Sequence, residues 1–477
     1  MKYALRRQQL LRQLHNPLLL FSGGEVARNS PTHAFPFRAD SNFLYLFGPC
    51  EPGCAAFFDS DSGHIRFFAP GRTLQSALWT GPRPSFEELK EALKVEEVLE
   101  AERLEEEVER LKAGRPLSSL AVADERATRL AQTLTGLESL SFKQGQLGPP
   151  EVLKALALMR LYKDADELEE VRRAIDITCQ AQLGVMQHTR PGTSVQELYV
   201  RLIATFARHS CTEAFATILT ARGEILHNPT LSGCLQEEAL LLLDAGAERP
   251  SGYCADITRT WPVSGKFSAQ AKTIYEAVLE ANRRCMEAVR PGVWFKTLQR
   301  IASEAMVEGL REAGLLRGSA ENILEAGALS VFFPHGIGHL LGLEVHDMAA
   351  FGNLGSLLSE SAPTQEKALG EQPKPRADLA LKEGMLFTVE PGLYFIPSRI
   401  HFAEYRNTYG EFVNFEEAER YLQMHGGRGF GGIRIEDNVL CTQAGAEVLT
   451  AGLPKQLEEV EALIGTASER SFRPLAT

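Results

Sequence analysis

Long hydrophobic runs are missing from this sequence. No stretch approaches the roughly 18 consecutive apolar residues of a membrane-spanning helix, so the sequence predicts no membrane segment. The N-terminal stretch begins with basic residues, but its only apolar run, Leu18 to Phe21, is too short for the core of a signal peptide, and no small-residue cleavage site follows. We therefore expect a cytoplasmic protein.

Positive charge and cysteine are also scarce. The chain has 50 Lys and Arg residues against 62 Asp and Glu, a formal net charge of −12. This balance argues against a nucleic-acid partner, because phosphate contacts need clustered Lys and Arg. Eight cysteines are scattered over 477 residues, and Cys50 with Cys54 lacks the second pair of a structural zinc site. We expect reduced, mostly buried thiols.

The residues that are present suit a globular protein of two or three domains, with 44% hydrophobic and 23% charged residues. Short apolar runs between turn signals predict a sheet near the N-terminus. These runs are Leu18 to Phe21, Phe43 to Phe47, Ala55 to Phe58 and Ile65 to Ala69. Helical patterns follow in residues 85–114, 152–178, 268–289 and 298–310. Together they predict an α/β (α+β) fold.

Three histidines, His335, His339 and His346, lie within twelve residues of one apolar, glycine-punctuated segment. Imidazole both binds borderline metals and moves protons near neutral pH. Carboxylates that could complete a site stand at or beside short apolar runs on both sides of this segment. They are Asp244, Asp256, Glu390 and Glu436. One such aspartate alone is more often a cap or turn residue, so only the whole set indicates a site.

The combined charge of these carboxylates indicates a metal. Four carboxylates in one cleft would repel each other and become protonated unless about four positive charges were supplied. Two divalent metal ions supply that charge. Oxygen-rich ligation with a single imidazole favours Mn, Co, Fe or Zn over a thiolate-bound structural zinc.

The segments that carry these five residues resemble the "pita-bread" metallopeptidases, the group containing methionine aminopeptidase, aminopeptidase P and prolidase. The segments are LLLDAG, ADITRT, HGIGHLLGLEVHD, FTVEPGLYF and GGIRIEDNV. The resemblance implies a smaller, mixed, aminopeptidase P-like N-terminal domain over residues 1–160. A pita-bread catalytic domain over residues 161–465 and a tail over residues 466–477 would follow it.

The resemblance also implies roles for the five residues at a dinuclear metal site, with Mn²⁺ expected and Co, Zn or Fe as alternatives. Asp256 and Glu436 would bridge the two ions. Asp244 would complete the shell of one ion, and His339 and Glu390 that of the other. Glu390 would also accept the proton of the attacking water, as in two-metal hydrolysis.

Other residues of the matching motifs are implied to surround this site. His335 and His346 would contact substrate and stabilise the tetrahedral intermediate, or alternatively orient the metal ligands. Arg434 would pair with a ligating carboxylate. His227 matches a histidine that proline-directed members keep near the substrate, although alone it would be interpreted as a turn residue.

The N-terminal segment FRADSNFLYLFG is similar to the N-terminal domain of aminopeptidase P and prolidase. In that family the domain helps to build a dimer and overhangs the partner's site. The resemblance therefore implies a homodimer in which Trp79 faces a substrate across the interface. A packed core position is the alternative for Trp79.

The C-terminal half resembles prolidase more than aminopeptidase P, which implies a small peptide substrate with proline at the second position. Arg376 stands fourteen residues before Glu390, where similar prolidases place an arginine that binds the free carboxylate of a dipeptide. An aminopeptidase P that cleaves longer Xaa-Pro peptides is the alternative. A remote one is an inactive binding module on the same fold.

Three features depart from the family pattern. Asp256 follows Asp244 by twelve residues rather than eleven, which predicts one extra turn residue in the connecting hairpin. Phe215 stands where a tyrosine is expected to support the first aspartate, so a supporting hydroxyl is lost. Residues 349–378 are rich in Gly, Ser, Pro and Glu and are expected to form a lid or rim loop.

Overall fold

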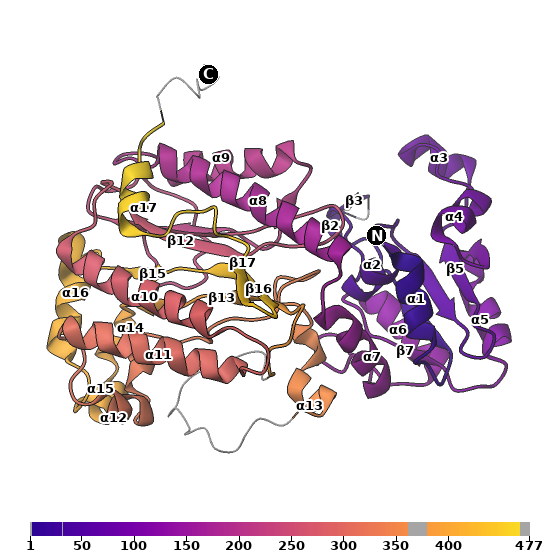
Figure 1. Cartoon of the computed structure of the whole chain (residues 1–477). Helices are drawn as coiled ribbons and strands as arrows, with labels where there is room; N and C mark the ends of the chain where they lie inside the picture. Colours follow the sequence, from indigo (N-terminus) through magenta and orange to yellow (C-terminus); the bar gives the residue numbers. More distant parts are fainter. Residues whose placement is uncertain (1, 31, 361–378, 468–477) are drawn as a thin grey trace. The chain divides into compact units, whose positions relative to one another are not determined.

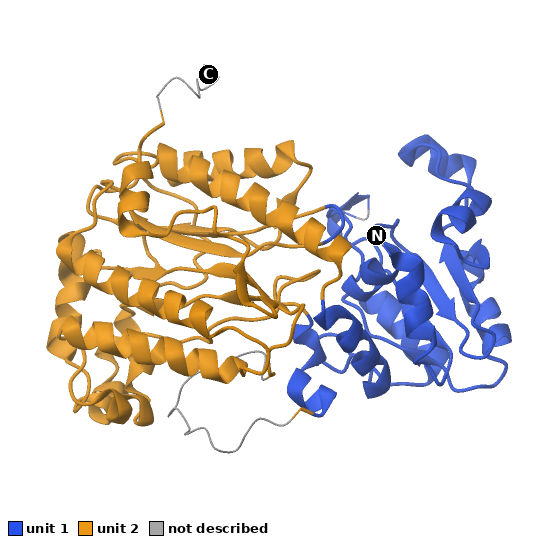
Figure 2. Ribbon diagram, in the orientation of Figure 1, with its two compact units in different colours: residues 1–162, 250–252, 348–359 blue, residues 163–249, 253–347, 360–477 orange. Residues whose placement is uncertain are grey.

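The structure is a computed structural model that describes residues 2–30, 32–360 and 379–467. The chain divides into two compact units (Figure 2). The first unit comprises residues 1–162, 250–252 and 348–359, and the second comprises residues 163–249, 253–347 and 360–477. Both combine sheets with helices (Figure 1), which confirms the predicted α/β (α+β) class.

The first unit is built on a mixed five-stranded sheet with the strand order β6-β5-β4-β1-β7. Its strands are β1 (Leu18–Phe21), β4 (Ala55–Phe58), β5 (Ile65–Ala69), β6 (Glu97–Glu100) and β7 (Ser118–Ser119). β1, β4 and β5 pair antiparallel, whereas β6 and β7 are added in parallel at the two edges. The three central strands are the predicted apolar runs, and all their residues except the half-buried Arg66 are buried.

Helices and one hairpin complete this unit. The hairpin pairs β2 (Ala27–Ser30) with β3 (His33–Ala34). The helices are α1 (Tyr3–Leu11), α2 (Ser41–Phe47), α3 (Leu74–Thr80), α4 (Phe86–Leu93), α5 (Leu104–Lys112), α6 (Glu125–Thr135), α7 (Pro150–Leu161) and α13 (Leu354–Leu358). Two 3₁₀ turns, η1 (Ala101–Arg103) and η3 (Ala349–Phe351), also belong to it.

The predicted strand at Phe43 to Phe47 is wrong, because this run forms helix α2. Asp40 caps the helix, since its Oδ1 accepts hydrogen bonds from the backbone N–H groups of Asn42 (2.9 Å) and Phe43 (3.2 Å). Gly48 ends it at φ 78°. Every residue of α2 is buried, so the run has no polar face whose period could identify a helix.

The charged region 85–114 is helical in part, as predicted, but the strand β6 separates its two helices, α4 and α5. Ser85 caps α4 and Glu88 completes the capping box. Val98 and Leu99, which fit the helical spacing, instead belong to β6, which pairs with β5. Sheet pairing with a distant partner overrides the local pattern here.

The second unit contains two three-stranded sheets. One has the order β12-β10-β9, from β9 (Ile218–Thr220), β10 (Leu240–Ala245) and β12 (Ile257–Pro262). The other has the order β13-β16-β17, from β13 (Leu386–Val389), β16 (Asp437–Thr442) and β17 (Gly445–Val448). Two-stranded pairs accompany them, namely β8 (Thr212–Glu213) with β11 (Ala247–Glu248) and β14 (Gly392–Tyr394) with β15 (Gly432–Arg434).

Long helices cover these strands (Figure 1). α8 (Ala165–His188) packs on β11 and β12, whereas α10 (Ala269–Ala288) packs on β14, β15 and β17. α9 (Val195–Arg208) packs against α8, and α11 (Phe295–Glu312) against α10. The shorter elements are α12 (Ala320–Glu325), η2 (Ala328–Val331), α14 (Pro397–His401), α15 (Ala403–Tyr409), α16 (Phe415–Gly427) and α17 (Leu457–Leu463). The predicted helices 268–289 and 298–310 correspond to α10 and α11.

Other predictions have mixed outcomes. The helical stretch 152–178 is divided between α7 and α8, because Asp164 caps a new helix with a capping box. The predicted loop 349–378 begins with η3 and α13 rather than with irregular chain, and residues 361–378 lie outside the described residues.

All cysteines are free, and all but Cys50 and Cys234 are buried. Across the described ranges, no helix is long and apolar enough to cross a membrane.

Candidate metal centre

Asp244 and Asp256 are brought together by the antiparallel pairing of β10 with β12. Asp244 lies on β10 opposite Thr258, and Asp256 immediately precedes β12. Gly246 permits the tight connection, because a Cβ at this position would lie 1.8 Å from the carbonyl oxygen of Ala255. The two carboxylates thus reach one site although the hairpin is one residue longer than expected.

His339 is held beside Glu390 by backbone hydrogen bonds to β13. The N–H of Thr388 donates to the carbonyl of His339 (2.8 Å), and the N–H of Glu390 donates to that of Ile337 (2.8 Å). Gly338 allows this approach, because a Cβ there would lie 2.0 Å from the Thr388 carbonyl oxygen. The glycine-punctuated pattern of the histidine segment therefore has a steric cause.

Glu436 joins the site from the turn between β15 and β16. Its N–H donates to the carbonyl of Thr258 (3.0 Å), and the Thr258 hydroxyl donates to its Oε2 (2.8 Å). Asn438 supports the neighbouring ligand candidate, because its side-chain amide bonds both the N–H and the carbonyl of Asp256. Sequence reasoning missed Thr258 and Asn438, although both stand two residues from a candidate carboxylate, on the same side of a strand.

The side chains converge at one point. Ligand atoms of Asp256, His339 and Glu436 all lie within 4.8 Å of one another. Nε2 of His339 is 3.4 Å from Asp256 Oδ2 and 3.6 Å from Glu390 Oε1. Nδ1 of His339 lies 3.0 Å from the carbonyl oxygen of Leu340. A carbonyl oxygen can only accept, so Nδ1 donates in this hydrogen bond, and Nε2 is the nitrogen that faces the carboxylates.

Three carboxylates of the site have a raised pKa. Burial raises the pKa of Glu390 to about 7, and the attraction of His339 and Arg434 only partly opposes this. Burial and neighbouring carboxylates also raise the pKa of Asp256 and of Glu436 well above the usual range. These shifts show that the ionised cluster needs positive charge that the surrounding protein does not supply.

Arg434 supplies part of that charge. Its Nη2 donates to Asp244 Oδ2 (2.6 Å), its Nε to the Thr258 hydroxyl (3.0 Å) and its Nη1 to the Tyr394 hydroxyl (2.8 Å). The other oxygen of Asp244, Oδ1, is buried and has no hydrogen-bond partner among the described residues. Phe215, which lacks a hydroxyl, packs beside Gly246 near the same strand end.

This donor set fits divalent metal ions. Four carboxylates and one arginine leave a formal charge of −3 in a largely buried site, and an imidazole nitrogen faces two of the carboxylates. The buried Oδ1 of Asp244 offers a further oxygen ligand. Oxygen-rich ligation with one nitrogen suits Mn, Co, Fe or Zn rather than a thiolate zinc site.

His335 and Tyr394 form a second polar group beside the carboxylates. Nδ1 of His335 lies 2.9 Å from the carbonyl oxygen of Gly336 and 3.8 Å from Oε2 of Glu390. Its Nε2 lies 2.8 Å from the hydroxyl of Tyr394, which also accepts from Arg434. The Tyr394 hydroxyl thus connects His335 to Arg434. Sequence reasoning assigned no role to Tyr394, whose only signal is its place in the segment that follows Glu390.

Three of the remaining candidates are among the described residues. His346 packs its ring against His339, with 4.3 Å between centroids. His227 is exposed in a turn. Trp79 lies on α3 of the first unit and is 76% exposed, so a packed core position is wrong. Arg376 lies outside the described residues.

Comparisons with known proteins agree with this geometry. The family model "Metallopeptidase family M24" matches residues 169–443, and "Aminopeptidase P, N-terminal domain" matches residues 3–119. Human Xaa-Pro dipeptidase is 30% identical over 99% of this chain and 95% of its own length. A probable Xaa-Pro aminopeptidase of Aspergillus clavatus is 33% identical over 87% of this chain and 82% of its own. The structure of aminopeptidase PepP of Pseudomonas aeruginosa superposes with a TM-score of 0.79 at 28% identity, covering 97% of both chains.

Proposed function

The chain belongs to metallopeptidase family M24, and from this premise we propose that it hydrolyses the bond before proline in small Xaa-Pro peptides. The observation that carries the proposal is the convergence of the carboxylates of Asp256, Glu390 and Glu436 with the imidazole of His339. The family implies divalent metal ions, and we propose two, with Mn²⁺ as the physiological metal.

The ligand set in this proposal is Asp244, Asp256, His339, Glu390 and Glu436. Asp256 and Glu436 would be shared by both ions, Asp244 would serve one, and His339 with Glu390 the other. When bound, the ions acidify a water molecule and polarise the scissile carbonyl. The raised pKa of three of these carboxylates supports the assignment, because metal ions would supply the missing charge.

In this proposal Glu390 is the residue that transfers the proton. Its Oε1 faces His339 and its Oε2 faces His335, so the carboxylate stands between the ligand cluster and the histidine-tyrosine pair. Glu390 would accept the proton of the attacking water and pass it to the leaving proline nitrogen. His335, oriented by Tyr394, and His346, packed on His339, would contact the substrate and the oxygen on which negative charge develops.

The substrate explains why a dedicated enzyme is needed. The proline nitrogen carries no hydrogen and the ring restricts φ, so peptidases that bind an extended chain through that N–H fail on such bonds. We propose that Arg376 binds the terminal carboxylate of a dipeptide, whereas a longer peptide carries no carboxylate at that distance. His227 would lie near the bound substrate.

A paired substrate assay tests this proposal. The protein is treated with chelator, reloaded with Mn²⁺, and assayed on an Xaa-Pro dipeptide beside the matching Xaa-Pro-Yaa tripeptide. We expect cleavage of the dipeptide, with kcat/KM falling about 100-fold in Arg376→Ala, the loss of a charge-assisted bidentate contact. Lys374→Ala removes the same charge two residues away and should leave the rate unchanged.

The same assay distinguishes the alternatives. Preference for the tripeptide, with Arg376→Ala without effect, would indicate Xaa-Pro aminopeptidase activity of the kind named for the fungal relatives. Absence of both activities and of Mn²⁺ binding in a folded protein would indicate an inactive binding module and overturn the proposal.

We further propose a cytoplasmic homodimer in which Trp79 faces the partner's substrate. The large exposed apolar residues of α3, Leu74, Leu78 and Trp79, support an interface, and the free thiols support a reducing compartment. Light scattering should give twice the chain mass, and Trp79→Ala should raise KM without changing metal affinity. A monomer with unchanged KM in Trp79→Ala would contradict this part.

A further inference from the structure

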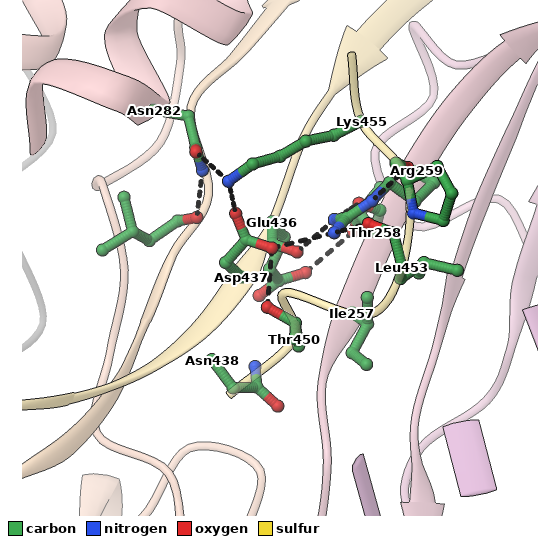
Figure 3. Close-up of polar contacts among 12 residues, drawn as sticks. Ile257, Thr258, Arg259, Asn282, Glu436, Asp437, Asn438, Thr450, Leu453 and Lys455 are labelled. Atoms are coloured by element: carbon green, nitrogen blue, oxygen red, sulfur yellow. Dashed lines mark hydrogen bonds and ion pairs between the residues drawn. The ribbon is translucent and has the colours of Figure 1, made fainter. Parts of the chain in front are cut away.

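A second group of buried charged and polar side chains, centred on Asp437, lies next to the candidate metal centre. Asp437 follows Glu436 in the chain, and the alternation of side chains along an extended segment directs the two to opposite faces. Figure 3 shows Asp437 among Arg259, Thr450 and Lys455. Its Oδ1 accepts from Arg259 Nη2 (2.8 Å) and from the Thr450 hydroxyl (2.6 Å), and its Oδ2 accepts from Lys455 Nζ (2.5 Å). Asp437 and Arg259 are fully buried, so their ion pair is shielded from solvent.

Arg259 connects this cluster to the backbone of Glu436. Its Nη1 donates to the carbonyl of Glu436 (2.7 Å) and to that of Thr258 (3.0 Å). Its Nε and Nη2 also donate to the carbonyls of Pro454 and Leu453. One guanidinium therefore holds the main chain of a candidate ligand against the segment that leads to Lys455.

Lys455 extends the connection to Glu390. Besides Asp437, its Nζ donates to Oδ1 of the buried Asn282 on α10 (2.7 Å). The Nδ2 of Asn282 donates in turn to the carbonyl of Val389 (3.5 Å), the residue before Glu390. A single ammonium thus lies between Asp437, the residue after Glu436, and Asn282 (Figure 3).

Charge neutrality does not account for Lys455. Arg259 alone balances the single negative charge of Asp437, so Lys455 adds a surplus positive charge. The ammonium instead fixes the relative position of two chain segments, because its two hydrogen bonds join segments that share no helix or turn.

We propose that Lys455 is a positioning residue of the metal centre, which sets the spacing between Glu436 and Glu390 through Asp437 and Asn282. This inference rests on the proposed function. Carboxylates that hold metal ions must keep their separation to within a few tenths of an ångström. Partners beyond the ligands commonly change metal affinity or activity about 10–100-fold when they are removed.

Solvent can reach Lys455, which gives the inference a sharp test. Its side chain is 20% exposed, and it lines a cavity of about 480 Å³ together with Asn282, Glu280 and Gln456. Lys455→Ala would leave a polar space, open to solvent, with Asp437 Oδ2 and Asn282 Oδ1 at its inner end. A small alkylammonium ion could occupy that space and restore both hydrogen bonds.

The experiment compares Lys455→Ala with the control Lys266→Ala, which removes a 76% exposed lysine paired with Glu461 outside this cluster. Calorimetry of the metal-free proteins gives Mn²⁺ affinity, and dipeptide hydrolysis gives kcat and KM. We expect Lys455→Ala to lose about 10-fold in Mn²⁺ affinity and in kcat, with KM nearly unchanged. Millimolar ethylammonium should restore both, and the control should behave as wild type with and without amine.

Three results would overturn the inference. Wild-type Mn²⁺ affinity and kcat in Lys455→Ala would exclude a positioning role while leaving the proposed function intact. Losses that ethylammonium does not reverse would indicate general destabilisation, and a lowered melting temperature in the metal-free variant would identify it. If the wild-type protein itself bound no Mn²⁺, the proposed function would fail first, and the inference with it.

Discussion

Glu436 and Asp437 are neighbours in the chain, yet they occupy opposite electrostatic environments. Both are buried. Burial and the carboxylates of Asp256 and Glu390 raise the pKa of Glu436. Burial also acts on Asp437, but there Arg259 and Lys455 prevail and hold the pKa well below its usual range.

The difference separates two uses of a buried acid. Next to the site, the protein supplies its own cations, so the charge of Asp437 is permanent and structural. In the site, Arg434 is shared among several acids, and the remaining charge is left for ions from outside. Removing the charge from one neighbour or the other should therefore have opposite effects on the metal-free protein.

The largest effect is expected from Glu436→Gln. If Glu436 is the shared ligand that we propose, its loss should lower kcat/KM by about 1,000-fold or more. The metal-free protein should nevertheless become more stable at pH 8, because an uncompensated buried charge is removed. Activity assays and urea unfolding in chelator measure the two effects, and a destabilised metal-free variant would contradict the comparison.

Asp437→Asn removes the same charge one residue later and should destabilise the protein. Arg259 and Lys455 would lose their anion in a buried setting, at a cost of about 3–5 kcal/mol in the free energy of unfolding. Urea unfolding with and without Mn²⁺ should show the loss in both states. The double variant Asp437→Asn/Lys455→Met should recover part of it, and failure to recover any would argue against repulsion between the two cations.

The pH dependence of stability should distinguish the two environments. Because the pKa of Glu390 is raised from 4.5 to about 7 in the folded state, the folded protein binds more protons than the unfolded one in that interval. The free energy of unfolding of the metal-free protein should therefore fall as pH rises from about 4.5 to 7, by about 3 kcal/mol from Glu390 alone.

Asp437 should not contribute to that slope. Its folded-state pKa is lowered, so its stabilisation is present above its ordinary pKa of 3.8 and is lost only as pH falls below that value. Urea unfolding at several pH values, in chelator and in saturating Mn²⁺, checks both statements. Saturating metal should flatten the slope, and equal slopes in the two conditions would contradict the role of the raised pKa.

Arg434→Lys should give the smallest effect of the four. Lysine keeps the positive charge. Its single nitrogen, however, cannot replace the three guanidinium nitrogens that donate separately to Asp244, Thr258 and Tyr394. We expect a loss of about 10–100-fold in Mn²⁺ affinity or kcat. Arg420→Lys, at a 77% exposed arginine, is the matched control, and equal values in the two variants would remove any special role from Arg434.

Much of the fold follows from local patterns, but not all of it. The strands around the acids and the helices behind them show the expected periods, as α10 and α11 demonstrate. Helix α2 was mispredicted because it is buried on all sides and has no polar face. Val98 and Leu99 were misassigned because their pairing partner, β5, is some thirty residues away.

The supporting residues of the site were harder to predict than the candidate ligands. Asp244, Asp256, His339, Glu390 and Glu436 could be selected as a set, because together they have a metal chemistry and match a family motif. Arg259, Asn282 and Lys455 have no such signature, since each becomes meaningful only through a contact distant in the chain.

The sequence by itself determined the composition of the site: four carboxylates and three imidazoles on short apolar or glycine-rich segments, in an order typical of one metallopeptidase family. Only the tertiary structure decided which nitrogen of His339 faces the acids, that Tyr394 joins Arg434 to His335, and that Asp437 faces away from Glu436 toward its own cations. The physical reason is that charge compensation depends on distance in space, and strand pairing sets that distance between residues far apart in the chain.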